Sequence, residues 1–351
     1  DVRAMAERLL LRARRGGCGT RSVSLRGMRL QRVPRGLASL PGLRALSLRD
    51  NELRCLPVEL GGLSRLTELN LGNNIFEEVP EQLKYLSSLQ KLYLFGNKIT
   101  TISPTIFDGL EKLILLSMNN NKLKYLPPEI HRLENLENMN LNYNQLESIP
   151  KELCSLQKLS ELHLSHNCLI TVPEEIGYMT NLRMLCLSRN QIGVLPDGLC
   201  KLRKLRILDV AGNKIQIFPI AMEDLMLMEL YCEDNPLLRK QPVSAIQEEE
   251  VWSLKEIAAR FIFSQLTKDD SILHTAVKQN LEACNILSKK QECAQCGQGF
   301  LNIWLECVRF VNVRQKMKIS RNVHLLPVRT LLCSYKCFNH PGHGFFGIAV
   351  P

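Results

Sequence analysis

The sequence predicts an α/β solenoid of about ten 23-residue turns, with a parallel sheet on its concave face and a small Cys-rich α/β cap after it. Asparagine recurs every 22 to 24 residues, proline keeps nearly the same interval, and apolar residues stand at fixed distances before each asparagine. Such a period indicates stacked repeats, because each turn can bury its apolar side chains only against its neighbours. The asparagines are Asn51, Asn74, Asn97, Asn121, Asn144, Asn167, Asn190, Asn213 and Asn235.

Each turn contains the block L-x-x-L-x-L-x-x-N, for example Leu159, Leu162, Leu164 and Asn167. We expect the three leucines to point into one continuous core, with a short strand per turn in a parallel sheet. The asparagine side chain can satisfy backbone groups where the chain bends after the strand, since buried polar backbone must be paired. Proline begins the return path, where its missing N–H does no harm. The L-P-x-x-L-x-x-L spacing that follows predicts helical or 3₁₀ turns on the convex side.

This block and period resemble the Ras-scaffold class of intracellular leucine-rich repeat proteins over residues 20–238. The resemblance implies a leucine-rich repeat solenoid, and it implies little about function, because one fold hosts many functions. We therefore expect four segments. They are a basic capping helix over 1–19, the solenoid over 20–238, a helical cap and linker over 239–290, and a Cys-rich zinc-binding segment over 291–351.

Positive charge is concentrated at the start of the chain. The formal net charge is +10, and residues 1–35 hold ten arginines against Asp1 and Glu7. The cluster fits either a solvated capping helix followed by a basic first repeat, or a contact for an acidic protein, lipid or RNA. Basic residues are not interleaved with aromatic ones, so we expect no nucleic-acid partner.

The variable positions of each strand line the concave face of a solenoid. Aromatic side chains there bring a large contact area at little entropy cost, so they are the candidate anchors for a protein partner. Single exposed aromatic residues are also common without a partner. No acidic or cysteine residue has a regular relation to the two histidines of the set, which argues against a metal or catalytic pair. The candidate anchors are Tyr93, Phe95, Tyr143, His163, His166 and Tyr231.

A helix is predicted over 253–266, where Ser253 and Glu256 have the spacing of a capping box. One interpretation is that its apolar stripe caps the open end of the repeat core. The other rests on residues 253–262, which resemble the elongin-binding helix of SOCS-box substrate receptors. That resemblance implies docking on elongin C through Leu254, Ala258 and Ile262, although the family usually has cysteine at the second position. The stripe, which cannot face both partners at once, consists of Leu254, Ile257, Ala258, Phe261, Ile262 and Leu266.

Two cysteine pairs stand about forty residues apart near the C-terminus, Cys293-x-x-Cys296 and Cys333-x-x-x-Cys337. Tight pairs let two thiolates share one ion, and four thiolates close a tetrahedron, so the pattern predicts a structural zinc site. His340 or His343 could replace one ligand. Cys307 lies inside a β-prone run, which favours a buried core thiol. The alternative is that all these cysteines are reduced and buried in a small cap.

The sequence contains no motif that indicates catalysis, neither a phosphate-cradling glycine loop nor a G-x-S-x-G elbow. No apolar run is long enough to span a membrane, and Leu9–Leu11 is too short for a signal peptide. Thirteen scattered cysteines favour a reducing, intracellular compartment, which we expect to be the cytoplasm. The predicted function is a non-catalytic protein-binding scaffold or adaptor, with intracellular signalling as its expected setting. The alternative is a substrate receptor of a cullin–elongin ubiquitin ligase.

Nearly the full length of the chain also resembles one vertebrate family of leucine-rich repeat proteins. The resemblance rests on the repeat phase and on four short segments, and it implies no biochemical activity. The segments begin at Val251-Trp252, at Cys293-Ala-Gln-Cys296-Gly297, at Trp304-Leu-Glu-Cys307 and at Phe346-Gly-Ile.

Overall fold

The computed structural model describes residues 8, 10, 20–239, 252–266, 271–302, 305–314, 317–319 and 323–347. The chain divides into two units. The first comprises Asp1–Ile215, Glu223–Pro236 and Arg314–Val323, and the second comprises Gln216–Met222, Leu237–Val313 and His324–Pro351. The capping helix expected over 1–19 lies almost entirely outside the described residues.

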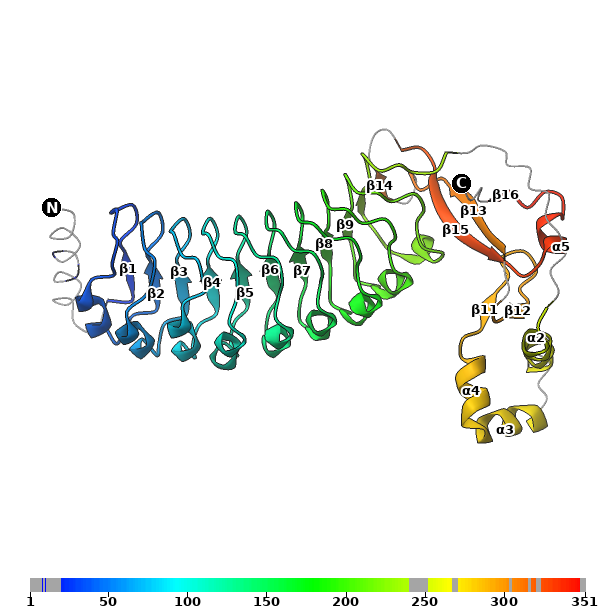
Figure 1. The fold of residues 1–351 in the computed structure, drawn as a ribbon, viewed down its shortest axis with the longest axis horizontal. Helices are drawn as coiled ribbons and strands as arrows, with labels where there is room; N and C mark the ends of the chain where they lie inside the picture. Colours follow the sequence, from blue (N-terminus) through cyan, green and yellow to red (C-terminus); the bar gives the residue numbers. More distant parts are fainter. Residues whose placement is uncertain are drawn as a thin grey trace. The chain divides into compact units, whose positions relative to one another are not determined.

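Ten three-residue strands form the first unit and pair in parallel in chain order, each in register with the next (Figure 1). The middle residue of each strand is buried and its neighbours are partly or fully exposed. The predicted solenoid of about ten turns is therefore confirmed. The strands are β1 (Ser22–Ser24), β2 (Ala45–Ser47), β3 (Glu68–Asn70), β4 (Lys91–Tyr93), β5 (Leu115–Ser117), β6 (Asn138–Asn140), β7 (Glu161–His163), β8 (Met184–Cys186), β9 (Ile207–Asp209) and β10 (Glu229–Tyr231).

Short 3₁₀ helices line the return path of the turns, as the spacing after each proline predicts. Most of them start directly after a proline, whose φ of about −65° suits the start of such a turn. The helices are η2 (Arg35–Ser39), η3 (Val58–Gly62), η4 (Glu81–Tyr85), η5 (Pro104–Gly109), η6 (Pro128–Arg132), η7 (Lys151–Ser155), η8 (Glu174–Tyr178), η9 (Asp197–Lys201) and η10 (Met222–Asp224).

The repeated asparagines form the ladder that the sequence predicts. The side-chain amide of Asn144 donates to the carbonyl oxygens of Met118 and Leu141, each at 3.0 Å. Its Oδ1 accepts the backbone N–H of Leu123 at 3.0 Å. Each asparagine thus joins its own turn to the one before it. The residue before the asparagine, for example Tyr143, takes a left-handed backbone conformation with positive φ in each of the nine turns.

The sheet gains an eleventh strand that the sequence pattern did not predict. Strand β14 (Lys318–Ile319) pairs in parallel with β10, and the backbone N–H of Lys318 donates to the carbonyl of Met228 at 2.8 Å. An open sheet edge is a liability, because its unpaired backbone groups can pair with another chain. A segment almost ninety residues further along the chain therefore pairs with the last repeat strand.

The second unit is built around an antiparallel sheet in the order β15-β13-β16, next to a two-stranded hairpin of β11 and β12. Phe218, which is fully buried, joins this unit because its backbone bonds to Pro327 and Arg329. The elements are α2 (Leu254–Leu266), α3 (Ser271–Gln279), α4 (Leu281–Leu287), β11 (Gln291–Glu292), β12 (Gly299–Phe300), β13 (Leu305–Val311), β15 (Leu326–Leu332), α5 (Tyr335–Phe338) and β16 (Phe345–Gly347).

Helix α2 forms where predicted, but the prediction of its buried face was wrong. The buried residues are Glu256, Ala259 and Phe263, which lie beside the expected stripe. Leu254 and Phe261 of that stripe are 85% and 63% exposed. The physical reason is that Ala259 and Phe263 pack against Leu301, and the carboxylate of Glu256 is held by the backbone of the same segment.

Replacing Asn144 with alanine removes three buried hydrogen bonds that connect two turns of the repeat. We expect the free energy of unfolding to fall by about 3 kcal/mol, since each unpaired buried backbone group costs about 1 to 3 kcal/mol. Urea unfolding monitored by circular dichroism measures the change. Asn135→Ala is the matched control, because the hydrogen bonds of the Asn135 amide, to the carbonyl of Glu111 and from the ammonium of Lys158, are exposed. An equal loss in the free energy of unfolding in both variants would show that the buried asparagine contributes no more to stability than the exposed one.

Candidate metal centre and partner-binding face

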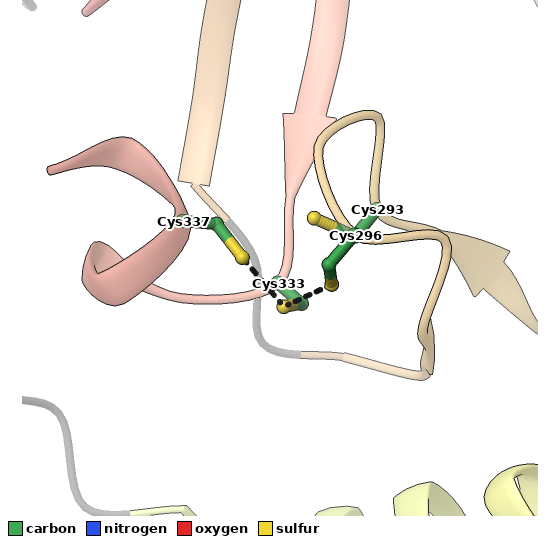
Figure 2. A group of neighbouring side chains, drawn as sticks. All are labelled: Cys293, Cys296, Cys333 and Cys337. Atoms are coloured by element: carbon green, nitrogen blue, oxygen red, sulfur yellow. Dashed lines mark hydrogen bonds between the residues drawn. The ribbon is translucent and has the colours of Figure 1, made fainter. Parts of the chain in front are cut away.

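Four cysteines, two from the β11–β12 turn and two from the segment that follows β15, meet in the second unit (Figure 2). Cys293 and Cys296 lie in the turn between β11 and β12, Cys333 follows β15, and Cys337 lies in α5. Their sulfurs all lie within 4.8 Å of one another. The sulfur of Cys333 is 3.6 Å from that of Cys296 and 3.6 Å from that of Cys337.

The turn that carries the first pair is fixed by backbone bonds. The N–H of Gly297 donates to the carbonyl of Cys293 at 2.9 Å, and the N–H of Cys293 donates to the carbonyl of Gln298 at 3.0 Å. Gly297 has a φ of +71°, which glycine adopts without the penalty that a side chain brings. The N–H of Ala294 donates to the carbonyl of Leu331, which ties this turn to β15.

The second pair is held by a single helical turn. Ser334 caps α5, and its side chain accepts the N–H of Cys337 at 3.4 Å. The cap turns Cys337 back toward Cys333, so that both sulfurs face the first pair (Figure 2). The spacing of four residues between these cysteines is therefore explained by one capped turn.

The thiols of Cys293, Cys333 and Cys337 differ in how easily they lose a proton. Burial raises the pKa of the Cys293 thiol, but hydrogen bonds from the backbone N–H groups of Cys296, Cys333 and Gln295 and from the Cys296 side chain together lower that pKa to about 7. Burial raises the pKa of Cys333 and of Cys337. Without a bound cation, the Cys293 thiol therefore ionises more readily than a free cysteine, and the Cys333 and Cys337 thiols ionise less readily.

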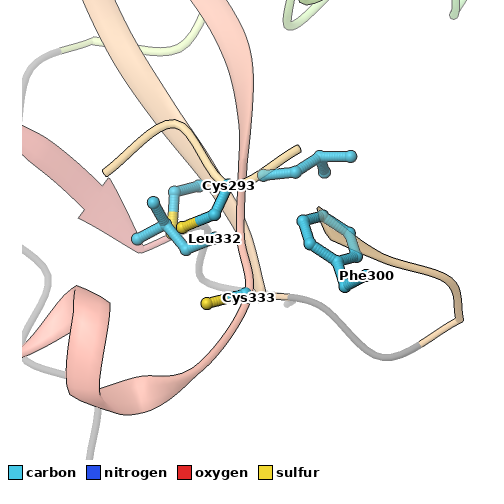
Figure 3. Close-up of a cluster of buried hydrophobic side chains, with 6 residues drawn as sticks. Cys293, Phe300, Leu332 and Cys333 are labelled. Atoms are coloured by element: carbon cyan, nitrogen blue, oxygen red, sulfur yellow. The ribbon is translucent and has the colours of Figure 1, made fainter. Parts of the chain in front are cut away.

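Buried apolar side chains pack with Cys293 and Cys333 in one cluster (Figure 3). Phe300 and Leu332 are fully buried beside Cys293 and Cys333. Cys307 belongs to the same cluster, is 2% exposed, and has a pKa raised by burial to about 12. It lies in β13 outside the four-cysteine group, so the prediction that it is a core thiol is confirmed.

The donor set fits a tetrahedral ion. Zinc–sulfur bonds of about 2.3 Å place the four sulfurs of a regular tetrahedron about 3.8 Å apart, which is close to the two 3.6 Å separations. Neither histidine that the sequence offered as a substitute ligand belongs to the group. The ring of His343 lies against the carbonyl of Phe338, and that of His340 lies 3.4 Å from the Gln295 amide.

A buried carboxylate that the sequence pattern marked only as a helix cap holds α2 in place. Glu256 is fully buried, and its carboxylate accepts the backbone N–H groups of Leu301 and Asn302 at 3.1 and 2.8 Å. It also pairs with Arg260 at 2.7 Å, and the guanidinium of Arg260 lies 3.8 Å from the centre of the Trp252 ring. Burial raises the pKa of Glu256, but the Asn302 N–H and Arg260 outweigh it, so the net pKa is lowered.

The sequence signal for this contact was the i, i+4 spacing of glutamate and arginine, which is common on exposed helices. Ser253 does accept the N–H of Glu256, at 3.2 Å, so half of the predicted capping box is present. The other half is replaced by the bonds to Leu301 and Asn302. These residues follow β12 directly, so Glu256 connects α2 to the hairpin that carries the first cysteine pair.

The predicted concave anchors fall into two rows. Tyr93, His163 and Tyr231 each end a strand and are half-buried, and Phe95 lies two residues beyond Tyr93. The imidazole of His163 lies 3.6 Å from the carboxylate of Glu161. The hydroxyl of Tyr231 donates to the carboxylate of Glu229, and this carboxylate lies 3.5 Å from Lys318 of the added strand.

Tyr143 and His166 lie at the corner where the chain leaves the strand. Their rings stack with centroids 4.1 Å apart, and both residues have positive φ. Asparagine, aspartate or glycine occupies this corner in most other turns. A tyrosine or histidine there costs about 1 kcal/mol or more in backbone strain. Backbone preference therefore does not explain why two aromatic rings stand at these corners.

The three residues of the elongin hypothesis share the outward side of α2. Leu254 and Ala258 are exposed and Ile262 is partly exposed. Ile257 and Phe261, at 49% and 63% exposure, extend the same apolar side. None of the buried residues of α2 belongs to this set.

Models of the leucine-rich repeat match most of the first unit. One matches residues 19–76, 87–146 and 134–192, and a second, for two copies of the repeat, matches residues 180–221. Together they cover more than half of the chain. The chain belongs to the leucine-rich repeat proteins.

Three vertebrate relatives share the name leucine-rich repeat-containing protein 69. The Xenopus laevis protein is 55% identical over 130 residues, which is 37% of this chain and 38% of that protein. The Homo sapiens and Mus musculus proteins are 50% and 49% identical over 123 and 129 residues. The resemblance to a vertebrate family is thus confirmed, although each match is shorter than the near full-length likeness that the sequence suggested. The chain spans less than two fifths of each relative.

Two solved structures share the repeat fold. The Leptospira interrogans leucine-rich repeat protein LIC12759 is 32% identical, with a TM-score of 0.58 over 60% of this chain and 54% of its own. The plant peptide hormone receptor RGFR1, solved in complex with RGF2, is 27% identical, with a TM-score of 0.54 over 66% of this chain and 38% of its own. Leucine-rich repeat proteins generally mediate protein–protein interaction.

Within the described ranges, no helix combines the length and the apolar character that crossing a membrane requires.

Proposed function

We propose that the chain is a non-catalytic scaffold that holds a protein partner on the sheet face of its solenoid. The stacked Tyr143 and His166 rings carry this proposal, because they form an exposed aromatic surface at two left-handed corners, a backbone conformation that disfavours tyrosine. Tyr93, His163 and Tyr231 extend the surface along the strand ends. Aromatic residues in such a position are the usual anchors of protein interfaces. The plant receptor RGFR1, a peptide hormone receptor solved in complex with RGF2, is consistent with this use of the fold.

Replacing Tyr93, Tyr143 and Tyr231 together with alanine is expected to weaken partner binding at least tenfold. Cross-linking in cells followed by quantitative mass spectrometry identifies the partner and measures its recovery. The matched control replaces Tyr85, Tyr125 and Tyr178, which are about 60% exposed on the return path of the repeats. Loss of the partner in this control triple, with retention in the first one, would place binding on the convex side and refute the proposal.

We further propose that the four cysteines bind one structural zinc ion in a reducing compartment, in keeping with the cytoplasmic location that the sequence predicts. The donor set carries this part of the proposal, since four sulfurs within 4.8 Å of one another suit a closed tetrahedral site. Four thiolate ligands leave no position for a substrate or water, so the ion would support the fold rather than catalysis. The small core around Phe300 and Leu332 offers little burial, which makes a metal link useful.

Metal analysis of the full chain is expected to give about one zinc per chain. Cys293→Ser and Cys337→Ser should each lose that zinc and lower the unfolding midpoint of the second unit. Cys307→Ser is the control, because Cys307 is buried in the same cluster without belonging to the four-sulfur group. A folded wild-type chain without metal, or zinc retained by Cys293→Ser, would contradict the site.

A second candidate function is the elongin-dependent substrate receptor, which the exposure of Leu254, Ala258 and Ile262 favours. None of the comparisons points to elongin, so this candidate rests on α2 alone. Co-purification with elongin B/C should occur for the wild-type chain and fall at least tenfold for Leu254→Glu. Lys255→Glu, at a neighbouring exposed position, is the control. Absence of elongin from the wild-type sample removes this candidate.

A further inference from the structure

Four arginines stand at the two ends of the first two strands. Arg21 and Arg44 precede β1 and β2, and Arg26 and Arg49 follow them. Backbone bonds place them in pairs: the N–H of Arg44 donates to the carbonyl of Arg21 at 2.8 Å, and that of Gly27 donates to the carbonyl of Arg49 at 3.1 Å. We call these four residues the arginine frame.

The floor between the two arginine pairs is made of small side chains. Ser22 and Ser24 of β1 lie beside Ala45 and Ser47 of β2, and all four side chains are exposed or half-buried. Later turns place larger residues at the same strand positions, such as Lys91 and Tyr93. The first two turns are therefore the part of the face where an extended chain can approach the sheet closely.

Two arginines of the frame have no charge partner among the residues that the structure describes. The side chains of Arg21 and Arg44 are exposed and make no hydrogen bond or ion pair with any described residue. Arg26 and Arg49 both contact Asp50, at 2.6 and 3.3 Å, and both use Nε. Asp50 thus pairs with two of the four arginines, and Arg21 and Arg44 have no acidic partner among the described residues.

An aromatic ring extends the frame along the sheet. The guanidinium carbon of Arg49 lies 5.0 Å from the centre of the Phe95 ring. Phe95 occupies space that a side chain at Gly72 would need, since an added Cβ there would lie 2.4 Å from the ring. The glycine of the third turn thus lets Phe95 reach back toward the arginines. A ring against a guanidinium helps to hold that side chain in place.

The distances between the four arginines indicate how far apart the charged groups of a ligand must be. Paired strands lie about 4.8 Å apart, and five residues of strand span about 16 Å. We propose that the arginine frame binds an extended acidic segment of a protein, in which two acidic pairs are separated by three neutral residues. The neutral floor favours a peptide over a nucleic acid, whose phosphates would continue across Ser24 and Ser47 with no cation to meet them. The inference deepens the proposed scaffold function, because it names the chemistry of one partner segment.

Fluorescence anisotropy of the full chain with a labelled peptide tests the inference. The probe is fluorescein-Glu-Glu-Gly-Ser-Gly-Glu-Glu, and its composition-matched partner carries the four glutamates in one block. We expect the spaced peptide to bind at least tenfold more tightly than the block peptide. We expect Arg21→Ser with Arg44→Ser to weaken spaced-peptide binding at least tenfold at an unchanged unfolding midpoint.

The matched control is Arg54→Ser with Arg65→Ser, which removes the same charge from exposed positions in the neighbouring return segments. It should change binding less than twofold. Equal losses in both double variants, equal affinity for the two peptides, or tighter binding of a labelled ten-nucleotide oligouridine would each overturn the proposal.

The outcome is separable from that of the scaffold proposal. If the wild-type chain binds the spaced peptide, and the variant without Tyr93, Tyr143 and Tyr231 still recovers the cellular partner, the proposed role of the aromatic surface is refuted. The proposal for the arginine frame is then unaffected. If the triple variant loses its cellular partner but the wild-type chain does not bind the spaced peptide, the arginine frame alone is refuted.

Discussion

The first unit depends on one repeated interaction, the triple hydrogen bond of a buried asparagine. Each of these side chains satisfies two carbonyls and one N–H that lie in adjacent turns, as Asn144 does for Met118, Leu141 and Leu123. Strands of three residues leave many backbone groups unpaired at each bend, and an unpaired buried group costs about 1 to 3 kcal/mol. The leucine core supplies burial in every turn, but the asparagines decide where each strand ends and how the next turn begins.

The asparagine ladder also fixes where certain surface side chains stand. Because the residue before each asparagine must take a positive φ, its side chain stands at a fixed corner of every turn. In most turns that residue is asparagine, aspartate or glycine, which tolerate the conformation. Tyr143, His166 and Arg189 instead place large side chains at three successive corners. A backbone requirement of the repeat thereby fixes the position of three large side chains in a row, and this row contains the ring pair on which the proposed scaffold function rests.

The second unit solves a different problem. It is a small sheet with a limited core, and two clusters of polar or ionisable side chains lie where its parts meet. Glu256 carries negative charge into a buried position where two N–H groups and Arg260 meet it, and it fixes α2 to the segment after β12. The four cysteines join the turn before β12 to the end of β15 and to α5. Both contacts converge on one hairpin, so α2 and the cysteine centre share the same support.

The solenoid is predictable from the sequence alone, because the contacts of its leucines, prolines and asparagines are made between neighbouring turns, and these turns are also neighbours along the chain. The grouping of the four cysteines is also predictable, since two closely spaced cysteine pairs are typical of residues that bind one metal ion together. Three features depend on the folded chain and could not be predicted from the sequence: the pairing of β14 with β10, the burial of Glu256 while Leu254 is exposed, and the contact of Phe95 with Arg49. These contacts join residues whose partners are set by the packed shape of the chain, and local spacing carries no record of that shape.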